Sequence, residues 1–477
     1  MRARLRVCDT IADTKTIQLM KKYIFLSLCL IATSAVSPVL GHPAAGEGQG
    51  TRAYTLEQVL DSALHNNIAI RNARYSIQSA QQQRKEAFTK YFPNVSAVGL
   101  WFNANKGMAE KTINPAEMMS PDMAGMLGQM LPPEMLASLT APVNVSLMKN
   151  GTVAGITAVQ PVFAGGQIIN GNRLAKVGED VSQLQLRLSE NEVEKTAEQY
   201  FWQIISLQEK AKTMDAVETM LSDIRKDVDV AVRAGVALRN DLLQVQLRQN
   251  EVESQKLKLQ NSISIVKLFL AQYCGLRDTS FVLTAGTDAA SILPVRQDHE
   301  QALLGTAEYQ LLDKQVEAAK LQKNIAVGQN LPTVGVGAGY NYHNLLDNDH
   351  SFGMVFATVR VPISDWWGGS YAIRRKKIAY QQAQDQLADN AQLLTIRMQN
   401  AWNGVVEARQ QLDIAQRSIE QSEENLRLHR DYYRAGTCRM SDLLEAQLLY
   451  QQSRDKYTDA YANLQNKLLE YRQSTGQ

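Results

Sequence analysis

The chain contains 477 residues, of which 50 are Lys or Arg and 48 are Asp or Glu, so its formal net charge is only +2. This balance argues against a nucleic-acid partner, which would require a basic excess or a basic stripe. The length would ordinarily suggest about three compact domains. However, Gln, Ala, Leu, Glu and Arg dominate the interior segments, a composition typical of long helices and coiled coils.

The first predicted element is a secretory signal. Basic residues at 20–22 precede an apolar run at 23–40, and small residues near the end of this run suit cleavage. An N-terminal membrane helix is the alternative, but Pro38 closes the run and a small, polar stretch follows it. We therefore expect residues 1–41 to form an N-terminal extension and a signal peptide.

Two similar series of elements follow. The first structural repeat, 54–274, is predicted to contain a helix at about 56–90, strands at about 94–103 and 152–160 on either side of a long loop at 104–151, and helices at about 171–232 and 241–273. An equatorial linker at 275–296 precedes the second structural repeat, 297–476, with a helix at about 297–329, strands at about 333–343 and 352–361, and helices at about 371–433 and 442–472. Each long helix would reach roughly 95 Å and each helix after it roughly 50 Å. Two short helices stacked end to end would therefore match one long helix.

The clearest sign of duplication is a turn that occurs twice between the predicted helices. Each copy has the order Arg-Ala-Gly, five further residues and Asp-Leu-Leu. The copies begin with Arg233, Ala234 and Gly235 before Asp241, and with Arg434, Ala435 and Gly436 before Asp442. Because the spacing is identical, the chain is predicted to consist of two homologous halves.

The predicted strands and helices both require further copies of the chain. In 333–343, Val, Ala and Tyr alternate with Gly, Thr, Asn and His, and about ten residues is the length of a transmembrane β-strand. Four strands cannot close a barrel, and an open sheet edge is not tolerated in lipid. The long helices carry apolar residues at steps of three and four among many polar ones, so they also need neighbours. We therefore expect an oligomer.

Motifs for catalysis or metal binding are missing from the sequence. Only Cys274 and Cys438 would remain after processing, and they fall at non-equivalent places in the two halves. The six His residues are scattered, without a metalloprotease motif, a phosphate-binding loop or a nucleophile elbow. The glycines at 335–339 lie inside the alternating strand pattern and lack the helix of a nucleotide site. We therefore expect neither an enzyme nor a bound cofactor or metal.

The duplicated order of helix, strand pair, long helix, Gly turn and Asp-Leu-Leu helix closely resembles the TolC-type outer-membrane efflux protein family. The most specific motifs are the segments 433–437 and 442–447, and the resemblance covers about 54–476. It implies an α+β membrane protein of the outer membrane of a Gram-negative bacterium. The implied assembly is a homotrimer in which a 12-stranded β-barrel in lipid is continuous with a 12-helix periplasmic α-barrel. Each chain would supply four strands, two long helices and four shorter helices.

The resemblance also implies a function and partners. The protein would be the exit duct of a tripartite efflux pump, and it would dock to a periplasmic adaptor, or membrane fusion, protein and to an inner-membrane transporter. The exit duct of a type I protein secretion system is the alternative within the same family. A non-channel periplasmic coiled-coil scaffold is the alternative of a different class, and it would explain the helices but not the duplicated strands.

Four residues are candidates for a periplasmic gate on the strength of the resemblance. Asp442 and Glu445 match acidic positions around the narrow entrance of the tunnel, Tyr433 matches a tyrosine that locks neighbouring helices, and Asp241 matches its acceptor. The turns at Arg233, Ala234 and Gly235 and at Arg434, Ala435 and Gly436 would form the adaptor-docking tip. Cys438 stands where well-known members have a basic residue.

The residues alone leave a simpler interpretation open for the same positions. Asp241 and Asp442 each precede three helical residues in the pattern of a capping box, and Gly235 and Gly436 fit helix ends with positive φ. In favour of a gate, Asp442 and Glu445 share one helix face, and threefold symmetry would bring their copies together on the axis.

A Met-rich insertion distinguishes the first half from the second. It contains Met108, Met118, Met119, Met123, Met126, Met130, Met135 and Met148. We expect adaptable apolar packing in a long extracellular loop at the mouth of the barrel. Because thioethers also bind Cu(I), a copper site is the alternative, although no Cys or His accompanies the methionines.

Overall fold

The computed structural model describes residues 53–477, apart from 108, 148, 285–293 and 346–348. The signal peptide predicted at 1–41 therefore lies outside the described residues. Within the described part of the chain, none of the helices combines the length and the apolar sequence that a membrane crossing requires.

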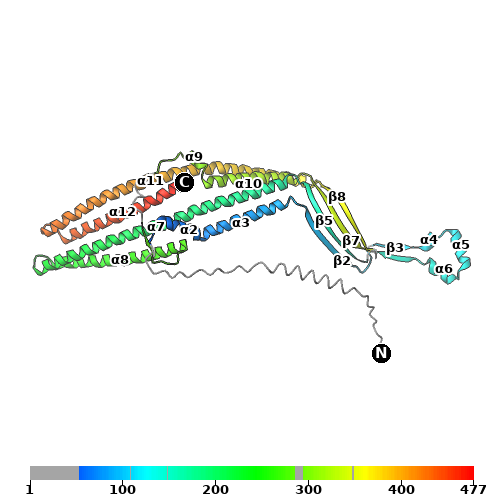
Figure 1. The fold of residues 1–477 in the computed structure, drawn as a ribbon, viewed down its shortest axis with the longest axis horizontal. Helices are drawn as coiled ribbons and strands as arrows, with labels where there is room; N and C mark the ends of the chain where they lie inside the picture. The colour runs from blue at the N-terminus through cyan, green and yellow to red at the C-terminus, as the bar shows by residue number, and fades with distance from the viewer. Residues whose placement is uncertain (1–52, 108, 148, 285–293, 346–348) are drawn as a thin grey trace, which may run out of the picture. The chain divides into compact units, whose positions relative to one another are not determined.

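Two series of elements repeat the same order along the chain (Figure 1). The first series consists of α3 (Ile68–Thr89), β2 (Asn94–Asn103), β5 (Asn150–Phe163), α7 (Gln167–Arg233) and α8 (Arg239–Cys274). The second consists of α10 (Ala307–Gln329), β7 (Thr333–Asn344), β8 (His350–Arg360), α11 (Asp365–Arg434) and α12 (Met440–Ser474). The strand bounds coincide with the predicted ranges to within a few residues. The same connection, from strand to long helix to turn to shorter helix, occurs in both halves.

The strands β2, β5, β7 and β8 form one antiparallel sheet in that order. Its register aligns Val98 with Gly155, Gly155 with Asn341, and Asn341 with Phe352. One irregularity interrupts the pairing of β5 with β7, beside Pro161, which has no backbone N–H to donate. Strands β2 and β8 are the two edges of the sheet within this chain.

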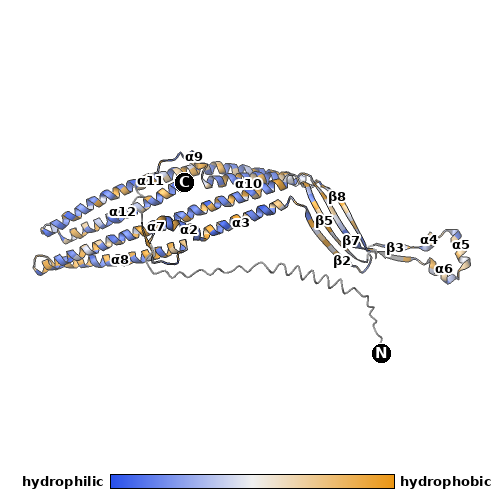
Figure 2. Ribbon diagram, in the orientation of Figure 1, coloured by the Kyte–Doolittle hydropathy of each residue, from blue (hydrophilic) through white to orange (hydrophobic). Residues whose placement is uncertain are grey.

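The long helices α7 and α11 contain 67 and 70 residues, which corresponds to about 100 and 105 Å. Helices α3, α8, α10 and α12 all pack against α7, and α10 and α12 also pack against α11. Figure 2 shows polar and apolar residues mixed along all these helices. Helices α3, α8, α10 and α12 therefore pack around α7, and α11 joins them through α10 and α12, without a globular core.

The prediction of four shorter helices per chain was wrong, because the described residues form nine helices besides the long α7 and α11. The first helix is split into α2 (Leu56–Asn66) and α3 at Asn67, which is extended, caps Ala69 and donates from Nδ2 to the carbonyl of Tyr273 at 3.2 Å. The corresponding helix of the second half is split into α9 (His299–Leu303) and α10. The side-chain caps at both breaks satisfy the freed backbone amides.

The linker predicted at 275–296 contains a short strand. Here β6 (Val282–Leu283) pairs in parallel with β1 (Ala53–Tyr54). The adjoining Phe281 is buried and stacks edge-on against Tyr54, with ring centroids 5.8 Å apart. The largest cluster of buried residues lies beside this strand pair, and its largest members are Ile70, Phe201, Trp202, Ile204, Leu270 and Phe281.

The segment predicted as a loop at 104–151 is instead structured. Strand β3 (Ala109–Ile113) pairs with β4 (Val143–Leu147), and α4 (Pro115–Met118), α5 (Pro121–Met130) and α6 (Pro133–Thr140) lie between them. Each of the three helices begins with Pro, whose fixed φ and missing N–H suit the first helical position.

Candidate functional site

The two predicted tip turns have the same backbone geometry. Gly235 and Gly436 each have a φ of 71°. After them, Val236 N–H donates to the carbonyl of Ala231 at 3.0 Å, and Thr437 N–H donates to the carbonyl of Tyr432 at 2.9 Å. This bonding closes the C-terminus of a helix around a left-handed residue. A Cβ at either glycine would meet no atom within 4 Å, so the backbone conformation and not the available space calls for glycine.

Asp241 and Asp442 have equivalent positions at the starts of α8 and α12. The Asp241 carboxylate accepts from the N–H of Leu238 at 3.4 Å, and the Asp442 carboxylate accepts from the N–H of Arg439 at 3.3 Å. The capping prediction was therefore right in kind and wrong in position, because each Asp is the third helical residue and not the N-cap. The helices begin two residues earlier than expected, after an extended Leu238 or Arg439.

Asp442 and Glu445 lie one helical turn apart on α12. Asp442 is half-buried and also accepts from Ser441 Oγ at 3.1 Å. Glu445 is exposed, and its carboxylate has no hydrogen bond or ion pair to the residues that the structure describes. One carboxylate is thus tied to its own helix, whereas the other is free to meet an ion or a second copy of the chain.

Tyr433 and Asp241 line the same groove between the two helix pairs. This groove has a volume of about 880 Å³, and its lining includes Arg430, Cys438 and Leu443. Burial raises the pKa of the Tyr433 hydroxyl, and the Asp241 carboxylate raises it further. The structure therefore brings Tyr433 and Asp241 together, but Asp442 and Glu445 do not line this groove.

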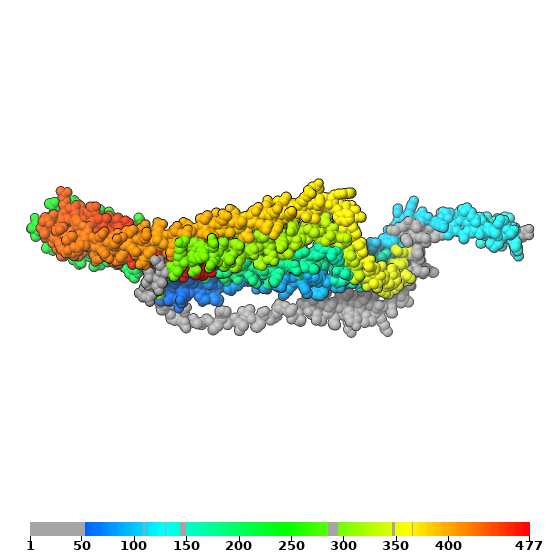
Figure 3. Space-filling view, turned by 90° about the horizontal axis from the view of Figure 1, so that it is seen from above, coloured from blue at the N-terminus to red at the C-terminus, as the bar shows by residue number. Residues whose placement is uncertain are grey.

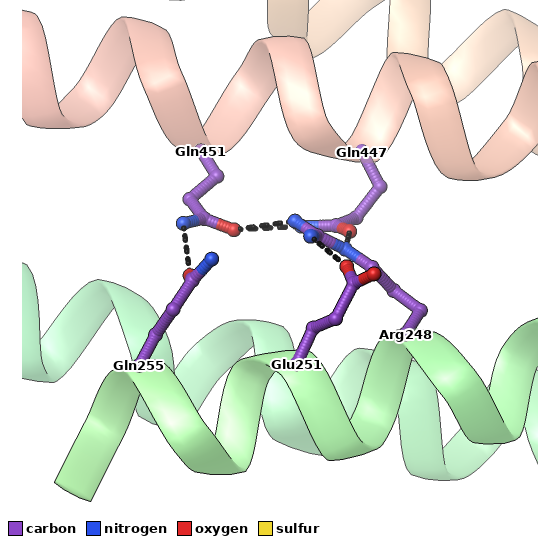
Figure 4. A network of polar contacts seen from close by, with 5 residues as sticks. All are labelled: Arg248, Glu251, Gln255, Gln447 and Gln451. Carbon is purple, nitrogen blue, oxygen red and sulfur yellow. Dashed lines mark hydrogen bonds and ion pairs between the residues drawn. The ribbon is translucent and has the colours of Figure 1, made fainter. Parts of the chain in front are cut away.

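A buried polar network joins α8 to α12 deeper in the helical region (Figure 4). Arg248 donates from Nε to Gln447 Oε1 at 3.1 Å, from Nη1 to Glu251 Oε2 at 3.0 Å and from Nη2 to Gln451 Oε1 at 2.9 Å. Gln451 also donates to Gln255 Oε1 at 3.3 Å. Arg248 is 8% exposed and Gln447 is fully buried.

All three nitrogens of the Arg248 guanidinium are hydrogen-bonded, as a buried charge requires. Separating α8 from α12 would remove Gln447 and Gln451 from the Arg248 guanidinium. The separation therefore costs free energy unless water replaces these two hydrogen bonds. The predicted site did not include Arg248. The sequence pattern that could have indicated Arg248 is its position on an apolar stripe, three residues after Val245 and four before Val252. Both valines are buried in the structure.

The four-stranded sheet has one predominantly apolar face. Cross-strand neighbours share a face, and the register places the row Val95, Ala158, Ala338, Val355 beside the row Ala97, Ile156, Tyr340, Gly353. Most large side chains of these rows are strongly exposed in the single chain, with Val355 at 87% and Tyr340 at 61%. The opposite face is mixed: it carries Ser96, Thr157, Asn341, His343 and Arg360 together with Val98, Leu100, Phe352, Met354 and Phe356. An apolar face of this kind suits contact with lipid.

The two cysteines are not poised for chemistry. Burial raises the pKa of Cys274 to about 12, and burial and the Asp442 carboxylate raise the pKa of the Cys438 thiol. Among the described residues, no group of His, Cys, Asp and Glu side chains is arranged to hold a metal ion.

A sheet with one apolar face, joined directly to helices of about 100 Å, is the fold of solved outer-membrane channels. The chain matches CusC with a TM-score of 0.73 and 15% identity over 94% of this chain and 99% of that one. It matches VceC from Vibrio cholerae with a TM-score of 0.68 and 15% identity over 88% and 96% of the two chains, and the outer membrane channel CmeC from Campylobacter jejuni with a TM-score of 0.68 and 14% identity over 88% and 85%.

The sequence comparison covers the C-terminal part of the chain. Residues 300–477 match the family model described as outer membrane efflux protein, whereas comparison with curated protein sequences gave no match. The predicted resemblance to the TolC-type outer-membrane efflux protein family is confirmed, and with it the location in the outer membrane. The fold is that of the solved outer-membrane protein VceC and the outer membrane channel CmeC.

Proposed function

We propose that the protein is the outer-membrane exit duct of a tripartite efflux pump and acts as a homotrimer. The observation that carries the proposal is the four-stranded sheet with an apolar face and two unpaired edges. Neither edge can remain open in lipid. Pairing β8 of one copy with β2 of the next would close the sheet, and three copies would give a 12-stranded barrel. The two structural repeats, 54–274 and 297–476, would then alternate around the threefold axis.

The helices support the same assembly. Large side chains such as Leu247, Leu257 and Ile396 are more than 60% exposed in the single chain, and neighbouring copies would cover them. Three chains would also bring three copies of α7 and α11 into one cylinder. A coiled-coil scaffold would not need the apolar sheet face, so the sheet argues against that alternative.

At the tip, the exposed turns 233–235 and 434–436 would dock the periplasmic adaptor, through which the inner-membrane transporter is coupled. Asp442 and Glu445 would ring the entrance, and Tyr433 beside Asp241 would hold the two helix pairs together. The Arg248 network joins the same helix pairs by hydrogen bonds and would keep them closed at rest. Delivery of secreted proteins instead of small substrates is the alternative, and it depends on which transporter engages the tip.

The experiment is single-channel recording in planar bilayers with protein extracted from outer membranes. We expect a small, cation-preferring conductance from the closed tip, because clustered carboxylates at a pore mouth attract cations. A variant without the network, Arg248→Ala, should conduct more, while Glu251→Gln serves as its matched control. Protein that inserts but never conducts, with or without Arg248, would contradict the proposal.

A further inference from the structure

The insertion between β2 and β5 is rich in apolar residues but does not form a hydrophobic core of its own. Its three helices and their connections, residues 114–142, contain the acidic side chains Glu117, Asp122 and Glu134 and no basic ones, whereas Lys106, Glu110, Lys111 and Lys149 lie in or beside the supporting strands. No described side chain between 104 and 143 is buried. Its apolar side chains are nevertheless numerous, and the exposed ones include Met118, Met123, Met126, Met130, Met135, Leu139 and Val143.

Elements of this size cannot hold themselves in place. Helices α4, α5 and α6 contain four, ten and eight residues, whereas isolated helices shorter than about 12 residues are marginal in water. The main contacts of α4 and α5 are with α6, where Gly128 lies against Leu136. The supporting ribbon, β3 with β4, is only two strands wide, and such a ribbon is also marginal alone. The segment therefore needs a partner to cover it.

The face that lacks a partner is well defined on α5. Met123, Met126 and Met130 follow at steps of three and four and therefore share one side of the helix. Their exposed fractions are 50%, 67% and 81%. The side of α5 toward α6 is occupied by Gly128, so the methionine stripe points away from the contact between these two helices. Because methionine is unbranched and flexible, such a stripe can pack against the same stripe of another copy over a range of helix orientations.

The position of the insertion identifies its partner. It begins directly after β2, an edge strand, and lies at the end of the sheet opposite to the helices, since α3 enters β2 and β5 leaves into α7. The ribbon extends this end by about 17 Å. Figure 1 labels the three helices beyond the sheet, and Figure 3 shows the atoms of the insertion (cyan) at the same end. Three copies of a barrel-forming chain would carry three insertions around one mouth. Tethered surfaces of this kind meet at effective concentrations on the order of mM.

A lipid surface fits the charges less well than another copy does. Helices that bind anionic membrane surfaces are rich in Lys and Arg, whereas the three charges on α4, α5 and α6 are all acidic. Each acidic residue lies in the first turn of its helix, where the helix dipole stabilises it. These positions explain the charges without a ligand and leave the methionine stripe free.

We infer that the insertions of three copies pack together through their methionine stripes and form a cap over the external mouth of the duct. The inference rests on the proposed trimeric duct. It adds a second closure, at the opposite end from the periplasmic tip, which the second half of the chain does not supply. Each cap helix completes its apolar packing only with residues of the other two copies.

Site-specific cross-linking tests the cap. The full-length trimer, carrying Cys438→Ser, is treated with a short bismaleimide after Met126→Cys or, as the matched control, Gly125→Cys. Gly125 is adjacent on the same helix and exposed, and a Cβ at this position would meet no atom within 4 Å, but it faces away from the stripe. We expect at least tenfold more covalent dimer from Met126→Cys.

A second variant, Met123→Gln with Met126→Gln and Met130→Gln, should raise single-channel conductance at least twofold.

The outcomes separate the cap from the duct. Native mass measurement of each variant reports the trimer independently of the cross-link. A trimer with equal or no cross-linking at both positions overturns the cap and leaves the duct standing. Protection of Met126→Cys from maleimide only in lipopolysaccharide-containing vesicles, without cross-linking, would mean a lipid partner and would also overturn it. Absence of any trimer would instead count against the proposed function.

Discussion

The two halves of the chain agree in their long helices and tip turns and differ in two places. At the far end of the sheet, only five residues separate β7 from β8, and Tyr342 and Asn344 of β7 both donate to Asp349, at 2.8 and 3.0 Å, whereas β2 and β5 carry the insertion. In the helices, Arg248 of α8 anchors a buried network, while the corresponding position of α12 is the exposed Leu449. The elements that both halves share form the barrel and the long helices of the proposed duct. The insertion and the Arg248 network, which only the first half has, would control its external mouth and its periplasmic tip.

The largest expected effect is at the unshared network. Arg248→Ala leaves Gln447 and Gln451 buried with unsatisfied groups, and we expect the free energy of unfolding to fall by about 2–3 kcal/mol. Chemical denaturation of the solubilised trimer measures this. Glu251→Gln is the control, because it keeps an acceptor for Arg248 and its side chain is 63% exposed; its expected change is below about 1 kcal/mol. Equal effects of the two variants would mean that the network is not a clamp.

The shared turns should respond alike in both halves. Gly235→Val and Gly436→Val each force a β-branched residue to a φ of 71°, at a cost of about 1–2 kcal/mol. We expect each variant to lose adaptor binding while insertion into the membrane is unchanged. Pull-down with the adaptor and membrane fractionation measure the two quantities. Ala234→Val and Ala435→Val, at ordinary helical φ, are the controls. Unchanged binding in both Gly variants would argue that the turns do not dock the adaptor.

The carboxylates at the tip test whether equivalent positions have different roles. Asp241→Asn and Asp442→Asn should each weaken the bond to the start of their helix by a similar amount, about 0.5 kcal/mol. Only Asp442→Asn combined with Glu445→Gln should reduce cation preference and block by multivalent cations, because it removes the charge ring. Reversal potentials in a salt gradient measure this. If the double variant keeps the selectivity of the unmodified protein, Asp442 only stabilises the start of its helix, as Asp241 does.

The smallest expected effect compares Glu198 with its counterpart in the second half, Gln399. Glu198 is 2% exposed and accepts from Trp202 Nε1 at 3.0 Å, and burial raises the pKa of its carboxyl above 4.5. The folded chain therefore holds this proton to higher pH than the unfolded chain, and stability falls as pH rises above 4.5 through the raised pKa.

Replacing Glu198 by Gln should remove this pH dependence and keep an acceptor for Trp202. We expect a gain on the order of 0.5 kcal/mol at neutral pH, measured by denaturation at pH 4 and pH 7. The exposed Glu420→Gln serves as a control that should change neither value. A loss of stability at neutral pH would mean that the charged form of Glu198 is favoured in the folded protein.

The sequence predicted the elements that depend on local rules. The Gly235 and Gly436 turns were predictable because few residues other than glycine adopt positive φ at a helix end, and 333–343 was predictable because its alternation has the period of a strand. The pairing of Tyr433 with Asp241 came from the family resemblance. In these cases the signal lies within a few residues of the feature, or in a motif that relatives share.

The missed elements depend on contacts between distant residues. Arg248 is explained only by Gln447 and Gln451, about 200 residues away, and Asn67 breaks its helix while bonded to the end of α8. In the insertion, the helices that begin at Pro115, Pro121 and Pro133 were missed, because whether a proline starts a helix depends on the segment after it. The placement of Asp241 and Asp442 as third residues instead of caps reflects the uncertainty of helix boundaries by one or two residues.

The central claim is that copies of this chain close into one duct through the open edges of their sheets. The most direct test is native mass measurement of the protein released from outer membranes in mild detergent. The account predicts a single species with three times the mass of the mature chain, which dissociates only when the barrel unfolds. A stable membrane-inserted monomer would contradict it, because β2 and β8 would then have to remain unpaired in lipid.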